Sequence, residues 1–156
     1  MNQALLSRVL QDDPEAIAAF GESDHCAVID WRDGLAEIVG AVSAFLPDHY
    51  LAVEQLPDHQ YNLLAGGRPP APVSVLPNVK QVALISAVNE AIQPEFELRQ
   101  FTPFDGDSYS LFVAPRVVWS AMERDHPKST ERLFLSAARL ASYWSKSYLS
   151  RIFSKP

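Results

Sequence analysis

Three residues whose types could support nucleophilic catalysis are adjacent in this sequence: Asp24, His25 and Cys26. A cysteine nucleophile needs a histidine whose side chain converges on the thiol, and a third group that orients the histidine. Neighbouring residues on a strand instead point to opposite faces. The sequence therefore favours a buried Cys26 that packs as a small apolar side chain, the usual state of an unpaired cysteine.

Residue types that bind metals occur without the spacing of a metal site. The four histidines lie far apart and show none of the paired spacing of zinc ligands. Asp105 and Asp107 have the spacing found in some divalent-metal loops, but an EF-hand loop also needs further acids and a closing glutamate. We therefore predict no metal site and no cofactor.

Gly66 and Gly67, followed by Arg68, could suggest a phosphate-binding loop. Such a loop needs a lysine and the start of a helix directly after its glycines, whereas prolines follow here. The sequence also lacks the Gly-x-Ser-x-Gly motif of serine hydrolases. These observations predict a protein that is not an enzyme, and an enzyme of unrecognised class is kept as an alternative.

The tryptophans Trp31, Trp119 and Trp144 could serve as exposed stacking platforms. Each of them lies within an apolar pattern. Because aromatic side chains bury a large apolar area, we expect all three to pack in the core.

Two strand-like runs predict a β-hairpin. Phe96 and Leu98 alternate with Glu97 and Arg99, which is the period of a half-buried strand. In the second run the apolar residues Tyr109, Leu111 and Val113 lie opposite Ser108 and Ser110. Asp105-Gly106-Asp107 lies between them, and an Asp-Gly pair tolerates the positive φ of a tight reversal. The hairpin leads directly into a predicted helix.

Hydrophobic periodicity predicts several other elements. Asp13 is a favoured N-cap, and Pro14 suits the first position of the helix that follows it. The expected helices cover residues 1–10, 14–21, 33–45, 78–92, 115–126 and 129–152, and the expected strands outside the hairpin cover residues 25–31, 50–56 and 60–64.

The last predicted helix is long and amphipathic. Its apolar stripe consists of Leu133, Ala137, Leu140, Ala141, Trp144 and Tyr148, with basic residues on the far side. We predict an α+β fold in a single domain of residues 1–156. An antiparallel sheet of about four to six strands should pack with several helices, including this long C-terminal one.

Length and composition describe one folded domain. At 156 residues, 47% of them hydrophobic, the chain can bury a sizeable core. Its formal charge of −6 disfavours nucleic-acid binding. Residues 1–15 lack the layout of a signal peptide, no apolar run could span a membrane, and the single cysteine fits a reducing compartment. We therefore expect a cytoplasmic protein.

Charge is distributed unevenly along the chain. From Lys128 onward there are six basic residues and one acid, a net charge of +5, so the preceding part carries −11. The basic segment could lie against acidic loops of the same chain. Alternatively, an acidic surface could remain free for a cationic partner.

Ile29-Asp30-Trp31-Arg32, followed by the helix predicted over residues 33–45, resembles a segment of small bacterial immunity proteins. Such proteins are found beside polymorphic or contact-delivered, type VI-like toxins. The order of the later segments is similar too: Pro72-Val73-Ser74-Val75, the helix of residues 84–89, Phe96-Glu97-Leu98-Arg99, the strand of residues 107–111, and Trp119. The resemblance covers residues 29–134, and Thr102-Pro103 interrupts a strand within it.

The resemblance implies a protein that binds a cognate toxin and blocks its active site. Toxins that attack nucleic acids or nucleotides have a cationic cleft, which attracts an acidic surface. The toxin-contacting surface differs between members of such families, so no binding residue is carried over. On this basis we expect the partner-binding residues to be the acidic residues Glu54, Asp58, Asp105 and Asp107, with Tyr109 as an aromatic neighbour. An adaptor or chaperone for a secreted effector is the alternative.

Overall fold

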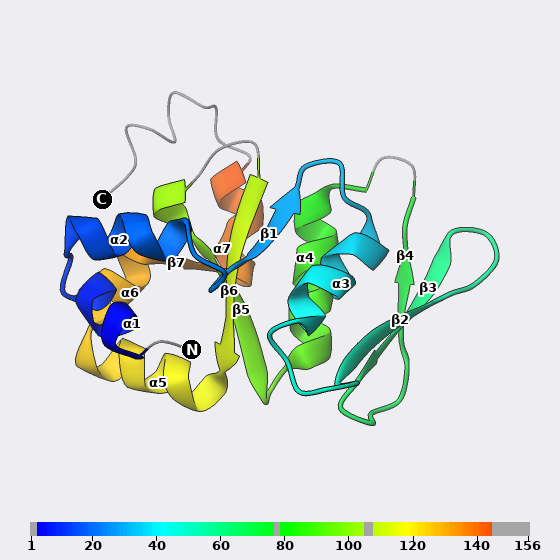
Figure 1. Cartoon of the computed structure of the whole chain (residues 1–156). Helices are drawn as coiled ribbons and strands as arrows, with labels where there is room; N and C mark the ends of the chain where they lie inside the picture. The colour runs from blue at the N-terminus through cyan, green and yellow to red at the C-terminus, as the bar shows by residue number, and fades with distance from the viewer. Residues whose placement is uncertain (1–2, 77–78, 105–107, 145–156) are drawn as a thin grey trace.

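Two antiparallel sheets alternate with two groups of helices along the molecule (Figure 1). The structure is a computed structural model that describes residues 3–76, 79–104 and 108–144. Its elements are α1 (Gln3–Leu10), α2 (Pro14–Gly21), β1 (Ala27–Asp30), α3 (Leu35–Ser43), β2 (Leu51–Gln55), β3 (Gln60–Ala65), β4 (Ala71–Ser74), α4 (Gln81–Ile92), β5 (Phe96–Phe101), a 3-10 turn (Thr102–Phe104), β6 (Ser108–Pro115), α5 (Arg116–Asp125), α6 (Pro127–Leu133), β7 (Phe134–Ser136) and α7 (Ala137–Trp144).

The strands form two sheets where the sequence predicted one. Sheet A has four strands in the order β1-β6-β5-β7, and sheet B has three in the order β2-β3-β4. All pairings are antiparallel. The α+β class and the hairpin of β5 and β6 are confirmed, whereas the hairpin tip at Asp105–Asp107 lies outside the described residues.

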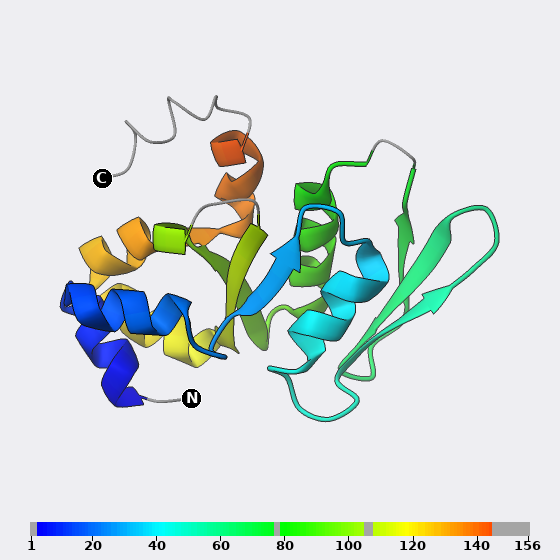
Figure 2. The ribbon, with the colours of Figure 1, turned by 45° about the horizontal axis from the view of Figure 1, so that its top comes forward.

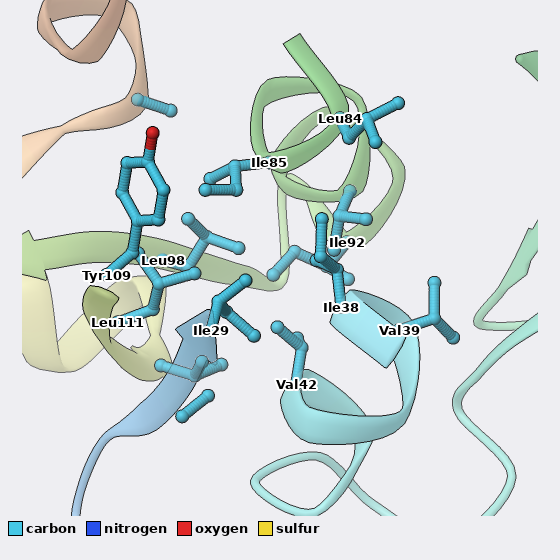
Figure 3. Close-up of a cluster of buried hydrophobic side chains, with 14 of the residues drawn as sticks. Ile29, Ile38, Val39, Val42, Leu84, Ile85, Ile92, Leu98, Tyr109 and Leu111 are labelled. Carbon is cyan, nitrogen blue, oxygen red and sulfur yellow. The ribbon is translucent and has the colours of Figure 1, made fainter. Parts of the chain in front are cut away.

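The first hydrophobic core lies between sheet A and sheet B, with α3 and α4 inside it. Figure 3 shows Ile29 and Leu111 of sheet A pointing toward Ile38 of α3 and Ile85 of α4. Leu63 of β3 closes the core from the side of sheet B. The two helices therefore have apolar neighbours on two sides, one from each sheet.

The second core is an aromatic cluster on the opposite face of sheet A. Phe20 of α2 contacts Phe101 of β5 with ring centroids 4.9 Å apart, and Phe112 of β6 contacts Trp119 of α5 at 5.4 Å. Phe134 of β7 contacts several of these rings. In Figure 2 the helices α1, α2, α5 and α6 form the layer that covers this face.

β6 is buried on both faces, although its alternation predicted a half-buried strand. Leu111 and Val113 point into the first core, while Phe112 and Ala114 point into the aromatic cluster. The polar residues of such a strand must then be small or paired, and Ser110 is indeed buried. Successive side chains of β6 therefore enter two different cores, the first mainly aliphatic and the second largely aromatic.

The long C-terminal helix was predicted wrongly. α6 ends at Leu133, residues 134–136 form β7, and α7 begins at Ala137. β7 supplies the outer partner of β5, pairing Phe101 with Phe134 and Gln100 with Leu135. Strand pairing and two-sided burial of these side chains override the helical periodicity of the segment. The part of the predicted helix beyond residue 144 lies outside the described residues.

An ion-pair cluster with a buried centre, Arg99 and Glu97, connects β5 to α5. Arg99 donates to Glu97 at 2.6 Å and to Glu123 at 2.5 Å, and Arg116 donates to the second oxygen of Glu97. The Arg99 guanidinium lies 4.4 Å from the Trp119 ring centre, and the Trp119 indole donates to the Glu97 carbonyl oxygen. Burial acts to lower the pKa of Arg99, but the hydrogen bonds to the two glutamates raise it above its ordinary value.

We predict that Arg99→Ala lowers the free energy of unfolding by about 1–3 kcal/mol, because the buried Glu97 carboxylate loses its buried partner and keeps only the half-exposed Arg116. Urea denaturation followed by tryptophan fluorescence measures this change. Arg124→Ala is the matched control, since Arg124 is exposed and pairs with its exposed neighbour Asp125. Equal stability of the two variants would contradict the role assigned to the cluster.

Candidate functional site

An open groove lies at one end of the molecule, between the turn that follows β1 of sheet A and the loop that follows β4 of sheet B. The loop after β1, the start of α4 and the far end of β4 meet there, at the top of Figure 1. The groove has a volume of about 370 Å³, and we call it the Trp31 groove. Its lining includes Trp31, Asp33, His59, Leu76, Gln81 and Leu84.

The residues after β1 form a tight turn that displays Trp31 and Arg32. The Asp33 amide donates to the Asp30 carbonyl oxygen at 3.0 Å, which closes a four-residue β-turn. The Asp33 side chain in return accepts from the Asp30 amide at 2.7 Å. Trp31 and Arg32 occupy the two central positions, so neither side chain is needed to close the turn.

Arg32 is held in place beside Trp31. Its side chain donates from Nε to Asp30 Oδ1 at 3.0 Å, and its amide donates to the same oxygen at 2.9 Å. The hydrogen bonds from the Arg32 side chain lower the pKa of Asp30 below its ordinary value. The guanidinium carbon lies 5.4 Å from the Trp31 ring centre, within the range of a cation–π contact.

Gln81 ties the turn to α4. Its side-chain amide donates to the Asp33 carbonyl oxygen at 2.8 Å and also to the Asp30 carbonyl oxygen. Gln81 is the first residue of α4, which packs in the first core. The turn is therefore fixed from both of its ends to buried structure.

Trp31 is 63% exposed, contrary to the expectation that it packs in the core. Strand β1 ends at Asp30, and the turn then directs the chain away from the core. Leu76, across the groove, is 64% exposed. Trp119 is fully buried as expected, and the side chain of Trp144 lies outside what the structure describes.

The hairpin of β2 and β3 carries two of the predicted partner-binding residues. Asp58 and His59 both have φ near +58°, and the Gln60 amide donates to the Pro57 carbonyl oxygen, as in a type I′ turn. Asp58 is exposed beside His59, which lines the Trp31 groove. Glu54 is exposed on β2 and accepts a hydrogen bond from Asn62.

The other predicted partner-binding residues are placed differently. Tyr109 is 9% exposed, and Figure 3 shows its ring within the first core. Its side chain is therefore not displayed on the surface as an aromatic neighbour of the acidic residues. Asp105 and Asp107 lie outside the described residues. Exposed Trp31 was missed as a site residue because apolar patterning alone does not distinguish a core tryptophan from one in a turn.

Residues 27–95 keep a surplus of acidic side chains. They include eight acidic and three basic residues, and two of the bases pair with acids of the same segment, Arg32 with Asp30 and Arg68 with Glu95. From the basic C-terminal part, Arg132 instead pairs with Asp12. The described contacts therefore leave this half of the molecule acidic.

Two residues of the motifs considered from the sequence, Arg68 and Cys26, are hydrogen bonded to the main chain and buried, respectively. Arg68, considered as part of a phosphate loop, donates to the Ala91 carbonyl oxygen at 2.5 Å and to that of Gln93, near the C-terminal end of α4. Cys26 is 6% exposed, and burial raises the pKa of its thiol from 9.0 to about 12.

Within residues 3–76, 79–104 and 108–144, no three His, Cys, Asp or Glu side chains are grouped so that they could hold a metal ion. In the same part of the chain, every helix is too short or too polar to cross a membrane.

The chain matches no protein-family model, no curated protein and no solved structure.

We predict that Cys26 is unreactive toward a thiol reagent while the protein is folded. With a pKa of about 12, only about one thiol in ten thousand is ionised at pH 8, and the sulfur is also shielded from solvent. Labelling with a chromogenic disulfide at pH 8 should be slower than that of free cysteine by about a hundredfold or more, and complete after denaturation in urea. Rapid labelling of the folded protein would show that the thiol is accessible and ionised.

Proposed function

We propose that this protein is an immunity protein of a contact-delivered, type VI-like toxin system that binds its cognate toxin in the bacterial cytoplasm. In this proposal it neutralises the toxin by covering the active site. The supporting observation is the exposed Trp31-Arg32 pair on a turn that hydrogen bonds fix on both sides.

The residue types on the turn favour a protein partner. Tryptophan and arginine are the residues most enriched among those that dominate interface energies. Asp33 and Gln81 fix the main chain of the turn, and Asp30 holds the Arg32 side chain, so binding would cost less entropy than the ordering of a free loop. Leu76, exposed on the other side of the groove, adds apolar area that a partner could cover.

The acidic character of residues 27–95 supports a cationic partner. Opposite charges on two proteins steer their encounter and raise the association rate at low ionic strength. Glu54 and Asp58 are exposed on the hairpin next to the Trp31 groove. An active-site cleft that binds phosphate groups would supply the complementary positive surface.

The test of the proposal is co-expression with the product of the adjacent gene, scored by cell survival and by co-purification. The wild-type chain should protect and co-purify, whereas Trp31→Ala should weaken binding by about tenfold or more, because it removes a central aromatic anchor. Val117→Ala is the matched control: Val117 is 75% exposed on α5, at the opposite end of the fold.

The possible results of the co-expression separate the alternatives. Unchanged affinity of Trp31→Ala for the toxin would rule out the Trp31 groove as the toxin-binding surface. A stable complex without protection would identify an adaptor or chaperone for a secreted effector. Absence of both a complex and protection would contradict the proposed immunity function.

We also predict that Glu54→Gln combined with Asp58→Asn slows association with the toxin several-fold at low salt and has little effect at high salt, about 0.5 M. The reason is that both side chains contribute to the field that steers the encounter. Stopped-flow measurement across a salt series gives the rates. Glu15→Gln, an exposed acid on α2, is the control, and an equal loss of rate in that variant would contradict local steering by the hairpin.

A further inference from the structure

The size and wall chemistry of the Trp31 groove limit what can enter it. Its volume of about 370 Å³ is near the lower end of ligand pockets, roughly 300–1,000 Å³, which suits one or two side chains and not a folded element. Val79 and Leu84 give it apolar walls, and Trp31 and Leu76 give it exposed apolar edges. A long side chain with an apolar stem therefore fits this space.

The rim of the groove favours a positive charge. The charge of Arg32 is compensated by Asp30, to which it is hydrogen bonded. Asp33 accepts one hydrogen bond through Oδ2, and an ionised carboxylate has room for further donors. Asp58 is exposed beside the groove, and with Lys80 at the start of α4 these five charged groups sum to −1. An anionic side chain would meet a like charge there.

The Trp31 ring also favours a cationic side chain in the groove. Arg32 shows that a guanidinium already lies within cation–π range of this ring. Because Trp31 is 63% exposed, much of the indole remains open to a second group. An arginine or lysine can place its aliphatic stem on apolar surface while its charged end stays hydrated or paired.

We infer that the Trp31 groove binds an arginine or lysine side chain of the partner protein. The stem of that side chain packs on Trp31 and Leu76, and its charged end faces the carboxylates of Asp33 and Asp58. As an account of toxin recognition, this assignment rests on the proposed function.

The probe is a phage-displayed library of random heptapeptides closed by a disulfide, selected on the full chain after removal of phage that bind the Trp31→Ala variant. Enriched peptides should carry arginine or lysine beside a large apolar residue. Synthetic peptides from the selection are then titrated against the protein by isothermal titration calorimetry. Replacing the cationic residue with norleucine should weaken binding by about tenfold, since it removes the cation–π and carboxylate contacts.

Graded variants separate cation binding from general apolar contact. Affinity should fall in the order Trp31, Trp31→Phe, Trp31→Leu, because leucine keeps apolar area but has no π face. Asp58→Asn should weaken binding severalfold, whereas Val117→Ala should leave it unchanged. Enrichment of peptides without a cation, equal binding by Trp31→Leu, or no enrichment at all would overturn the inference.

The peptide selection tests the groove chemistry, and the co-expression tests the immunity function, so either proposal can be contradicted while the other stands. If Trp31→Ala abolishes protection while the selection yields no cationic peptides, toxin binding at the groove stands and the inference about a cation is wrong. If cationic peptides bind as described while co-expression gives neither complex nor protection, the groove chemistry stands and the immunity function is wrong.

Discussion

The two-sided burial of β6 is the constraint on which the rest of the structure depends. Alternate side chains of this strand enter two different cores, so helices must cover both faces of sheet A. The aromatic face is covered by α1, α2, α5 and α6, and the aliphatic face by α3, α4 and α7. Sheet B then closes the far side of α3 and α4, which explains how a chain of this length forms four layers.

The same arrangement positions the Trp31 groove. β1 is an edge strand held by its pairing with β6, and the turn after it is hydrogen bonded to Gln81 at the start of α4. At the end of the strand, the Asp30 amide donates to the Asp33 side chain, and the Asp30 carbonyl oxygen accepts from the Asp33 amide. Neither group is therefore free to pair with another strand. Contacts that close the sheet edge therefore also hold Trp31 and Arg32 in an exposed, ordered position.

Local signals in the sequence predicted local structure well. Asp13 accepts from the amides of Glu15 and Ala16, as an N-cap should, and Pro14 begins the helix. The interruption at Thr102-Pro103 is a 3-10 turn that ends β5. In each case the structure is determined by residues close to one another in the sequence, so the local sequence is enough to predict it.

Features decided by distant contacts were not predictable in the same way. Residues 134–136 follow a helical pattern but form β7 because β5 needs a partner there. β4 was missed since Pro70 and Pro72 indicate a loop, although an edge strand tolerates proline where no amide is needed.

The exposure of candidate site residues also depended on tertiary context. Tyr109 was expected at the surface and is buried, whereas Trp31 was expected in the core and is exposed. Their exposure depends on which parts of the chain other elements cover, and this follows from the tertiary fold. Of the residues named from the sequence, Glu54 and Asp58 are exposed, and Asp58 adjoins His59 at the groove.

Site-specific photo-crosslinking from position 31 shows whether the Trp31 groove contacts the toxin. A photoreactive phenylalanine analogue placed at Trp31, and in a second variant at Val117, is irradiated in the presence of the adjacent gene's product. Our account predicts crosslinks from position 31 to residues beside the toxin's active site, and none from position 117. Crosslinks from position 117 alone would contradict it, because contact would then lie on α5 and not at the Trp31 groove.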